Sequence, residues 1–366
     1  MHFSITLAHA KELFLLPCSI ANSSKTNIAV LDYVYLKIEN SMATVFGTDG
    51  QSIIKIQIDV TVDDFEICIE AKKLSASLHG YTDNEKNIAF NFDNEKKVEI
   101  KYSRSKVNIA TADPQTYPIP IIAKPDQFQF TCSPNQLIAG IGRVQYAKAK
   151  LDVRKMLNHI NFSFVGDSLN LHATNGHRLV KTSVTVNDSM GDFEGILPTG
   201  LVDLILSVQP ETQCQFFFDQ SNFYCQVGHV TLASKFVAEQ YMNVSKLINP
   251  AIVNSTTLKT SALLQSANRI KLFLSGVKIP KLNLTLENAD LKMNADAGTG
   301  NEIDDYVEAQ SSSNEQTSIS LNPLYLIDAL KKIHSERVCL SFTNNNMLKI
   351  SDPDSTSFDA VIMAMR

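Results

Sequence analysis

Phe3-Ser4-Ile5-Thr6, a strand pattern that ends in a threonine, is followed by an apolar helix pattern, and the same order returns twice. The later copies begin with Phe128-Gln129-Phe130-Thr131 and Thr257-Leu258-Lys259-Thr260. The threonines lie about 125 to 130 residues apart, far above the ~20–50 residues of a solenoid repeat. The chain of 366 residues therefore contains three copies of one whole domain. We expect its function to depend on what the three copies build together.

Each copy continues with a short helix and a strand. The helices are expected at residues 72–78, 201–206 and 324–330, and the strands that follow begin at Ile88, Cys214 and Val338. Between the two helices of a copy, apolar and polar residues alternate, as in Ile160-Asn161-Phe162-Ser163-Phe164 and Leu169-Asn170-Leu171-His172-Ala173. Strict alternation is typical of antiparallel strands with one buried face and one face in water. Each domain is therefore predicted to be α+β, with two helices packed on antiparallel strands.

Prolines and polar residues mark the boundaries between the copies. Residues 112–125 contain Pro114, Pro118, Pro120 and Pro125, and a second linker is expected near residues 249–255. The predicted domains are therefore residues 1–123, 124–252 and 253–366.

The composition indicates a globular cytoplasmic protein. Hydrophobic residues make up 44% of the chain, which is ample for a core. The six cysteines are scattered without a CxxC pair, as expected in a reducing cytosol. The apolar run at residues 13–16 is too short for a signal peptide or a membrane span, so no membrane partner is predicted. The net charge of −5 alone argues against nucleic acid, but the distribution of charge matters more than its sum.

Basic residues concentrate in or beside the predicted helices of all three copies. For any single lysine a solvated helix face is a sufficient explanation. Their recurrence in every copy favours a shared basic surface. The candidates are Lys25, Lys72, Lys73, Arg143, Lys148, Lys150, Arg269, Lys331 and Lys332.

The first and third copies carry opposite charges. Basic residues in the first copy are Lys97, Arg104 and Lys106, and acidic residues in the third are Glu302, Asp304 and Asp305. A coincidence of loop charges would explain this pattern, and so would head-to-tail association of two chains through edge strands. The second interpretation predicts a homodimer whose apolar centre comprises Val107, Ile109, Leu272 and Phe273.

Asn175-Gly176-His177-Arg178 is the segment that most resembles a catalytic site. The first copy has Thr48-Asp49-Gly50 at the same place, and a shared Thr-[Asp/Asn]-Gly is a turn signal. The sequence contains no HExxH or GxxxxGK[ST] motif, so neither a metal nor another cofactor is predicted. A hydrolase or nucleotidyltransferase that uses His177 and Arg178 remains a remote alternative to a non-catalytic protein.

Several motifs resemble the bacterial sliding clamp family, the beta subunit of DNA polymerase III. They are Leu151-Asp152-Val153-Arg154 with Leu157-Asn158, Ala173-Thr174-Asn175-Gly176-His177-Arg178-Leu179, Thr199-Gly200-Leu201, Ala233-Ser234-Lys235-Phe236-Val237 and Val361-Ile362-Met363-Ala364-Met365-Arg366. The resemblance implies three tandem clamp domains, with two subunits closed head to tail around double-stranded DNA, helices lining the hole and strands outside. Such a ring contacts phosphates without reading bases and tethers the polymerase to DNA. An accessory copy that serves repair polymerases is the alternative within the family.

The resemblance also implies a pocket that binds a short peptide, typically a Gln followed by apolar residues, from partner proteins. These partners are the polymerase III catalytic subunit, the clamp loader and other proteins that carry such a peptide. The residues at the matching positions are Leu157, Thr174, Gly176, His177, Arg178, Leu179, Met242, Leu247, Val361, Ile362, Met363, Ala364, Met365 and Arg366. The chain departs from the family pattern at Met242 and Ala364, where proline is common, and it lacks a final leucine. The pocket should still be apolar, Met-rich and adaptable.

Overall fold

The computed structural model describes residues 2–23, 28–93, 97–119, 122, 130–187, 192–208, 213–219, 221–287, 290–311 and 316–365. These residues form two compact units, each of which takes part of the middle third of the chain. Unit 1 comprises Met1–Asn135, Val186–Gly191 and Leu197–Phe236, and unit 2 comprises Gln136–Thr185, Asp192–Ile196 and Val237–Arg366. Lys25 and Arg366, which the sequence assigned to DNA and partner binding, lie outside the described residues.

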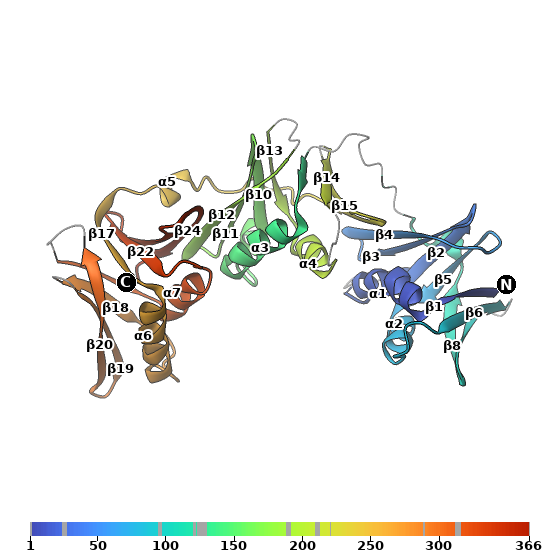
Figure 1. Ribbon diagram of the computed structural model, residues 1–366, viewed down its shortest axis with the longest axis horizontal. Coiled ribbons are helices and arrows are strands. Elements are labelled where there is room, and N and C mark those ends of the chain that lie inside the picture. The colour runs from blue at the N-terminus through green and yellow to red at the C-terminus, as the bar shows by residue number, and fades with distance from the viewer. Residues whose placement is uncertain are drawn as a thin grey trace. The chain divides into compact units, whose positions relative to one another are not determined.

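Unit 1 is built on a 12-stranded antiparallel sheet in the order β1-β6-β7-β8-β5-β2-β3-β4-β16-β15-β14-β9 (Figure 1). Its strands are β1 (His2–Thr6), β2 (Tyr33–Glu39), β3 (Met42–Thr48), β4 (Ser52–Asp59), β5 (Phe65–Glu70), β6 (Asn87–Asp93), β7 (Lys97–Tyr102), β8 (Ser105–Ala112), β9 (Phe130–Cys132), β14 (Cys214–Phe218), β15 (Asn222–Val227) and β16 (Val230–Lys235). Its helices are α1 (Leu7–Ser23), α2 (Ala71–His79), α4 (Thr199–Ser207) and the short η1 (Ala29–Asp32) and η2 (Pro114–Thr116).

Unit 2 has a second 12-stranded sheet, in the order β13-β10-β11-β12-β24-β23-β22-β17-β20-β19-β18-β21. Its strands are β10 (Ile160–Val165), β11 (Ser168–Thr174), β12 (Arg178–Thr185), β13 (Phe193–Leu197), β17 (Ile252–Lys259), β18 (Leu282–Glu287), β19 (Asp290–Gly298), β20 (Asn301–Ser311), β21 (Thr317–Leu321), β22 (Arg337–Thr343), β23 (Met347–Asp352) and β24 (Ser355–Met363). Its helices are α3 (Pro134–Val144), α5 (Ser245–Ile248), α6 (Thr260–Phe273), α7 (Pro323–Leu330) and the short η3 (Gln145–Ala147) and η4 (Lys155–Asn158).

The expected pattern of two helices on antiparallel strands is confirmed. α2, α4 and α7 occupy the places predicted for the second helix of each copy, and α1, α3 and α6 those of the first. The helix pattern of the third copy predicts a cap at Thr260 or Ser261, and this prediction is wrong for α6. The helix begins at Thr260, and the Thr260 hydroxyl donates to the carbonyl of Ser335 instead of accepting from the first turn.

Close packing of α1 on the sheet depends on a glycine. α1 contacts β2, β3 and β4 on one side and α2 on the other (Figure 1). A Cβ at Gly47 of β3 would collide with the backbone of Pro17 in α1. The missing side chain lets the helix lie directly on the strand.

No helix of the described chain is long and apolar enough to cross a membrane.

One strand pairing in each unit joins an end third of the chain to the middle third. In unit 1, β4 pairs with β16, so that Ser52 lies opposite Ser234. In unit 2, β12 pairs with β24, so that Arg178 lies opposite Ile362. The chain end therefore forms an inner strand of the sheet, because β24 also pairs with β23.

Candidate functional site

The turn between β11 and β12 carries His177 and Arg178. The Thr174 hydroxyl donates to the carbonyl of Arg178 at 2.6 Å and accepts from the Gly176 amide at 3.1 Å. The Asn175 carboxamide accepts from the amides of His177 and Arg178 at 3.0 and 3.1 Å. Gly176 has a φ of 86°, a conformation that glycine adopts without strain. The turn interpretation of this segment is confirmed.

Arg178 is held inside its own chain rather than offered to a ligand. Its guanidinium donates to Asp328 Oδ2 at 2.7 Å and to the carbonyl of Tyr146. It also lies 5.0 Å from the ring of Tyr146 and 4.5 Å from the ring of Tyr325. A planar cation between two aromatic rings is a favourable arrangement. These contacts fix the guanidinium beside the ring of Tyr325.

A pocket of about 440 Å³ opens beside this arginine. His177, Asn322, Tyr325, Met363, Ala364 and Met365 line it. His177 is exposed, and its carbonyl accepts a hydrogen bond from the amide of Met363 at 2.9 Å. His177 and the three tail residues were predicted to belong to the pocket, but Asn322 and Tyr325 were not. No linear signal marks those two, because they start a helix that looks like ordinary core.

The tail is part of the sheet up to Met363 and is then held by its backbone. Ile362 is 1% exposed and pairs with Leu348 as well as Arg178. Beyond β24, the amide of Ala364 donates to Asn346 and that of Met365 to Ser320. Strand pairing on both sides therefore buries Ile362. A truncation that keeps β24 must therefore end after Met363.

An apolar cluster lies under the pocket-forming strands. Its buried members are Leu179, Ile196, Tyr241, Val244, Ile248, Met347 and Val361, with Met156, Val237 and Leu247 packed against them. Leu157 and Thr174, two further residues of the predicted pocket, are also buried. Met242 is an exposed member of the predicted set. The predicted set thus contains buried residues of this cluster and three exposed residues, Met242, His177 and Met363.

Most of the basic residues expected to contact DNA lie on or directly after helices. Lys72 and Lys73 are exposed on α2, and Lys331 and Lys332 follow the last turn of α7. Lys148 and Lys150 follow η3. Three of the basic residues contact a partner in their own chain, and one of them is Lys332, which lies 5.9 Å from the centre of the Tyr146 ring. The other two are Arg143 and Arg269. Arg143 donates to Ser357 Oγ at 3.2 Å, and Arg269 forms an ion pair with Asp305 at 2.5 Å.

Three of the charged residues expected at the dimer interface, Lys106, Asp304 and Asp305, form ion pairs within the chain. Lys106 forms an ion pair with Glu99, and Lys101 pairs with the same carboxylate at 2.8 Å. Lys101, followed by Lys106, lowers the pKa of Glu99 to about 2. Asp304 pairs with Lys292 at 2.9 Å, which lowers the pKa of Asp304. These side chains are solvent-exposed pairs that cost little to rearrange on association.

The apolar residues of the predicted interface separate into two groups. Leu272 is exposed, and Val107 and Phe273 are half-buried, so all three have surface to offer. Ile109 is only 2% exposed and lies opposite Val98 on the inner face of its strand pair. Ile109 is therefore part of its own core and offers little surface to an interface, whereas Val107, on the same face of β8, is only half-buried.

Besides the terminal strands β1, β9, β13 and β21 of the two sheets, β8 and β20 each leave most of one edge unpaired in the described part of the chain. Residues 105–110 of β8 pair with β7 on one side, and only Thr111 and Ala112 reach β5 on the other. Residues 301–308 of β20 pair with β19, and only Ala309, Gln310 and Ser311 reach β17. Unpaired edges expose backbone donors and acceptors that can pair with another chain.

The described residues contain no group of three or more His, Cys, Asp or Glu side chains that could hold a metal ion. The cysteines are all free thiols, and burial raises the pKa of Cys68 and Cys132 to about 12. A thiol with a raised pKa is a poor nucleophile. With Arg178 occupied by Asp328 and Tyr146, the remote hydrolase alternative loses the cation that it required.

Three models of the DNA polymerase III beta subunit match consecutive parts of the chain. The N-terminal domain matches residues 11–121, the central domain residues 131–243 and the C-terminal domain residues 250–366. The "Beta sliding clamp" of Haemophilus influenzae is 24% identical, and that of Pseudomonas aeruginosa is 25% identical, each alignment covering 100% of both chains.

Solved structures show the same fold over the whole chain. The beta subunit of DNA polymerase III from Pseudomonas aeruginosa superposes with a TM-score of 0.91 at 24% identity, covering 100% of both chains. The DNA polymerase sliding clamp from Bacillus subtilis gives 0.92 at 17% identity, covering 100% of this chain and 99% of the other. Because the three family models together span nearly its whole length, the chain belongs to the DNA polymerase III beta subunit family, with three tandem clamp domains.

Proposed function

We propose that this chain is the sliding clamp of a DNA polymerase, a non-catalytic processivity subunit that works in the cytoplasm. Two copies close head to tail around duplex DNA and hold the polymerase III catalytic subunit and other DNA-processing proteins at their site of work. The domains span residues 1–123, 124–252 and 253–366. Tethering raises the local concentration of the polymerase at the primer end without any new contact to the substrate.

The observation that carries the proposal is the pair of open strand edges at opposite ends of the chain. The edge of β8 stands beside Arg104 and Lys106, and the edge of β20 carries Glu302 and Asp304. Pairing β8 of one copy with β20 of the other satisfies both edges and opposes opposite charges. Because each copy has one edge of each kind, two such contacts close a ring.

The basic helix residues supply the contacts to DNA. Lys72, Lys73, Lys148, Lys150, Lys331 and Lys332 are placed on or after helices, as a phosphate-contacting lining requires. Contacts of this kind carry no base specificity, so the ring can slide. Individual losses should be mild because the contacts are many.

Partner proteins dock through a short peptide in the pocket beside Arg178. Met363 and Met365 offer adaptable apolar contacts, and Tyr325 adds a ring fixed by the arginine. The Leu and Phe side chains of a Gln-x-Leu-Phe-type peptide suit such a lining. Clamp loader and polymerase would then compete for one site.

Retention on DNA of different topology tests the proposal. The clamp is loaded onto nicked circular DNA with a clamp loader and ATP, the protein-DNA complex is isolated by gel filtration, and half of it is linearised. We expect retention on the circle and release from the linear form, because only an encircling ring depends on closed DNA. Equal retention on both forms would contradict encirclement.

The dimer contact is tested separately. Replacing both Arg104 and Lys106 with glutamate should convert dimers to monomers in analytical ultracentrifugation at low micromolar concentration. Lys235→Glu, a charge reversal elsewhere on the surface of unit 1, serves as the control and should stay dimeric. A double variant that remains dimeric would place the interface elsewhere.

A further inference from the structure

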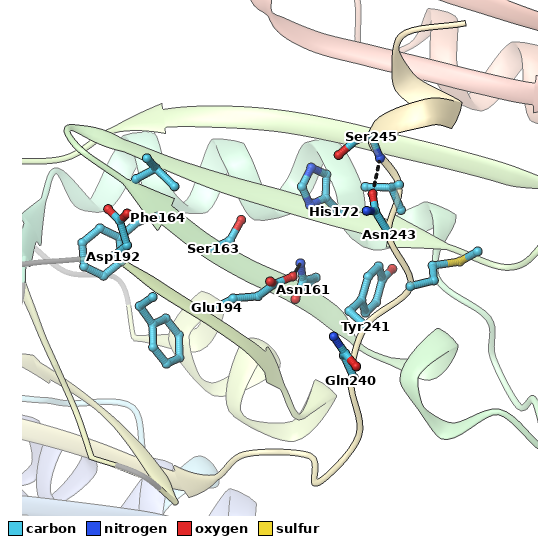
Figure 2. A pocket seen from close by; sticks show the side chains of 14 residues that line it. Asn161, Ser163, Phe164, His172, Asp192, Glu194, Gln240, Tyr241, Asn243 and Ser245 are labelled. Carbon is cyan, nitrogen blue, oxygen red and sulfur yellow. Dashed lines mark hydrogen bonds between the residues drawn. The ribbon is translucent and has the colours of Figure 1, made fainter.

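A second, larger groove lies on the outer face of the middle domain's sheet, within unit 2. It has a volume of about 910 Å³ and is formed by β13, β10 and β11, with the segment 240–245 crossing over them (Figure 2). The side chains of Asn161, His172 and Glu194 point into it from the sheet, and Tyr241 comes from the crossing segment. Met242 of the same segment also lines it.

The floor of this groove contains polar atoms without partners. Asn161 and His172 lie opposite each other on neighbouring strands, and they are 2% and 8% exposed. The Asn161 amide nitrogen donates to Glu194 Oε1 at 3.1 Å, which directs the amide oxygen away from the carboxylate. That oxygen and His172 Nδ1 are buried and have no hydrogen-bond partner. Buried polar atoms that lack partners cost free energy, so a site that keeps them needs a reason.

The first domain shows that the fold does not require polar residues here. Its equivalent strands place Tyr35 opposite Phe46, two residues before the turn threonine Thr48, as His172 lies two residues before Thr174. Tyr117 of the following linker stacks on Tyr35 at 5.5 Å. The same position is thus a buried aromatic pair in one domain and a buried polar pair under a groove in the next.

The groove's chemistry selects a cationic hydrogen-bond donor. Asp192 and Glu194 are exposed carboxylates along one wall, and Asn161 orients Glu194. Burial, followed by the charge of Lys181, lowers the pKa of His172 to about 4, so the imidazole adds no positive charge at neutral pH. The two carboxylates therefore make this wall of the groove negatively charged. A guanidinium presents several N–H groups in a planar fork that matches a carboxylate and a neighbouring amide oxygen.

We infer that this groove binds an arginine side chain of a partner protein, next to the apolar motif that the partner places in the pocket beside Arg178. Met242 lines the groove and is also one of the residues predicted for the peptide site, so the two sites have this residue in common. The inference rests on the proposed function, because it extends the same peptide site. A second charged contact would distinguish partners that share the same apolar motif.

Calorimetric titration with matched peptides tests this inference on the full chain. One peptide carries only a Gln-x-Leu-Phe-type core, and the others add one arginine or one lysine at either end. An arginine at one end should tighten binding at least about fivefold, because a charge-assisted bidentate contact is added. Lysine should add less than about twofold, because a single ammonium cannot pair with both the carboxylate and the amide.

Variants locate the effect. Glu194→Gln keeps the size of the side chain and the acceptor for Asn161, and it should remove the arginine gain while leaving affinity for the core peptide unchanged. Asp192→Asn should reduce the gain in part. Asp290→Asn, which removes an exposed acid on β19 outside the groove, is the matched control and should retain the full gain.

The outcomes distinguish a failure of the groove inference from a failure of the peptide pocket. If the core peptide binds and arginine adds nothing, or if Glu194→Gln retains the gain, the groove inference is overturned and the peptide pocket stands. If lysine gives the same gain as arginine, the guanidinium assignment is overturned. If the core peptide does not bind the wild-type protein, the partner pocket itself fails and the groove inference fails with it.

Discussion

Tyr117 of the first linker and the segment 240–245 cover equivalent positions on two domains. The side chains that they cover are aromatic in the first domain and polar in the middle domain. In the first domain the linker places Tyr117 on Tyr35 and leaves an aromatic pair sealed from water. In the middle domain the crossing segment covers Asn161 and His172 and leaves a groove. The backbone pairing is the same, so the difference arises from side chains alone. Repeated domains can therefore keep the same strand pairing while the side chains at one position change from aromatic to polar.

The two inter-domain strand pairings show the same contrast. At the β4–β16 pairing, Ser52 lies opposite Ser234 and their hydroxyls are 3.3 Å apart. At the β12–β24 pairing the equivalent positions are Arg178 and Ile362, followed by Met363 where the first pairing has Lys235. Apolar and aromatic contacts replace short polar ones, and the candidate docking pocket is found at this second pairing.

The largest expected effect on stability comes from removing the buried aromatic ring of Tyr35 in the first domain. Tyr35→Ala should lower the free energy of unfolding by about 3–5 kcal/mol, because a fully buried aromatic ring leaves a cavity. Urea unfolding followed by fluorescence measures the change. Tyr306→Ala, at an exposed tyrosine, is the control and should change stability by less than about 1 kcal/mol. A small loss at Tyr35 would show that the linker does not seal this face.

The pH dependence of stability tests the burial of His172 in the middle domain. The pKa of His172 is about 4 in the folded chain against 6.5 ordinarily, so the folded state disfavours its protonation. The corresponding stability is fully present above pH 6.5 and is lost as the pH falls toward 4, by roughly 3 kcal/mol in all. The difference in unfolding free energy between wild type and His172→Gln, measured from pH 7.5 to pH 4.5, should shrink accordingly. His177→Gln, at an exposed histidine, should follow the wild-type curve; identical curves for His172→Gln would contradict the burial argument.

A substitution that copies the first strand pairing into the second should weaken partner binding. Met363→Lys introduces the residue found at Lys235 and should reduce affinity for a Gln-x-Leu-Phe-type peptide at least about tenfold, because an apolar contact is replaced by a charge that resists desolvation. Met363 is 46% exposed, so stability should stay within about 0.5 kcal/mol. Met363→Leu is the control and should bind within about threefold of wild type. Unchanged affinity in Met363→Lys would move the peptide site elsewhere.

The smallest effect is expected at Asn161. Asn161→Ala removes one hydrogen bond to Glu194 and also an unpartnered oxygen, so the two terms oppose each other and stability should change by less than about 1 kcal/mol. The same unfolding assay that is used for Tyr35→Ala measures it. A loss as large as that of Tyr35→Ala would show that Asn161 is a structural residue, and the contrast between the two domains would disappear.

The sequence determined the elements that depend on local chemistry. Thr174-Asn175-Gly176 predicts its turn because the hydroxyl, the carboxamide and the glycine satisfy the turn within a few residues. Periodicity predicts the helices and the alternating strands. The charged residues beside the open edges of β8 and β20 can also be identified from the sequence. His177 and the tail residues of the pocket were found because they lie in motifs that resemble a known family.

The tertiary structure decided what covers each face. Alternation places His172 and Tyr35 on the outer side of their strands, but only the crossing segments determine that both are buried. Tyr146 and Tyr325 are far apart in sequence, and only folding brings both rings to Arg178. Periodicity reports the direction of a side chain relative to its own strand and carries no information about distant segments. The pocket and the polar groove are therefore properties of the assembled unit, because each needs residues that the chain supplies from separate elements.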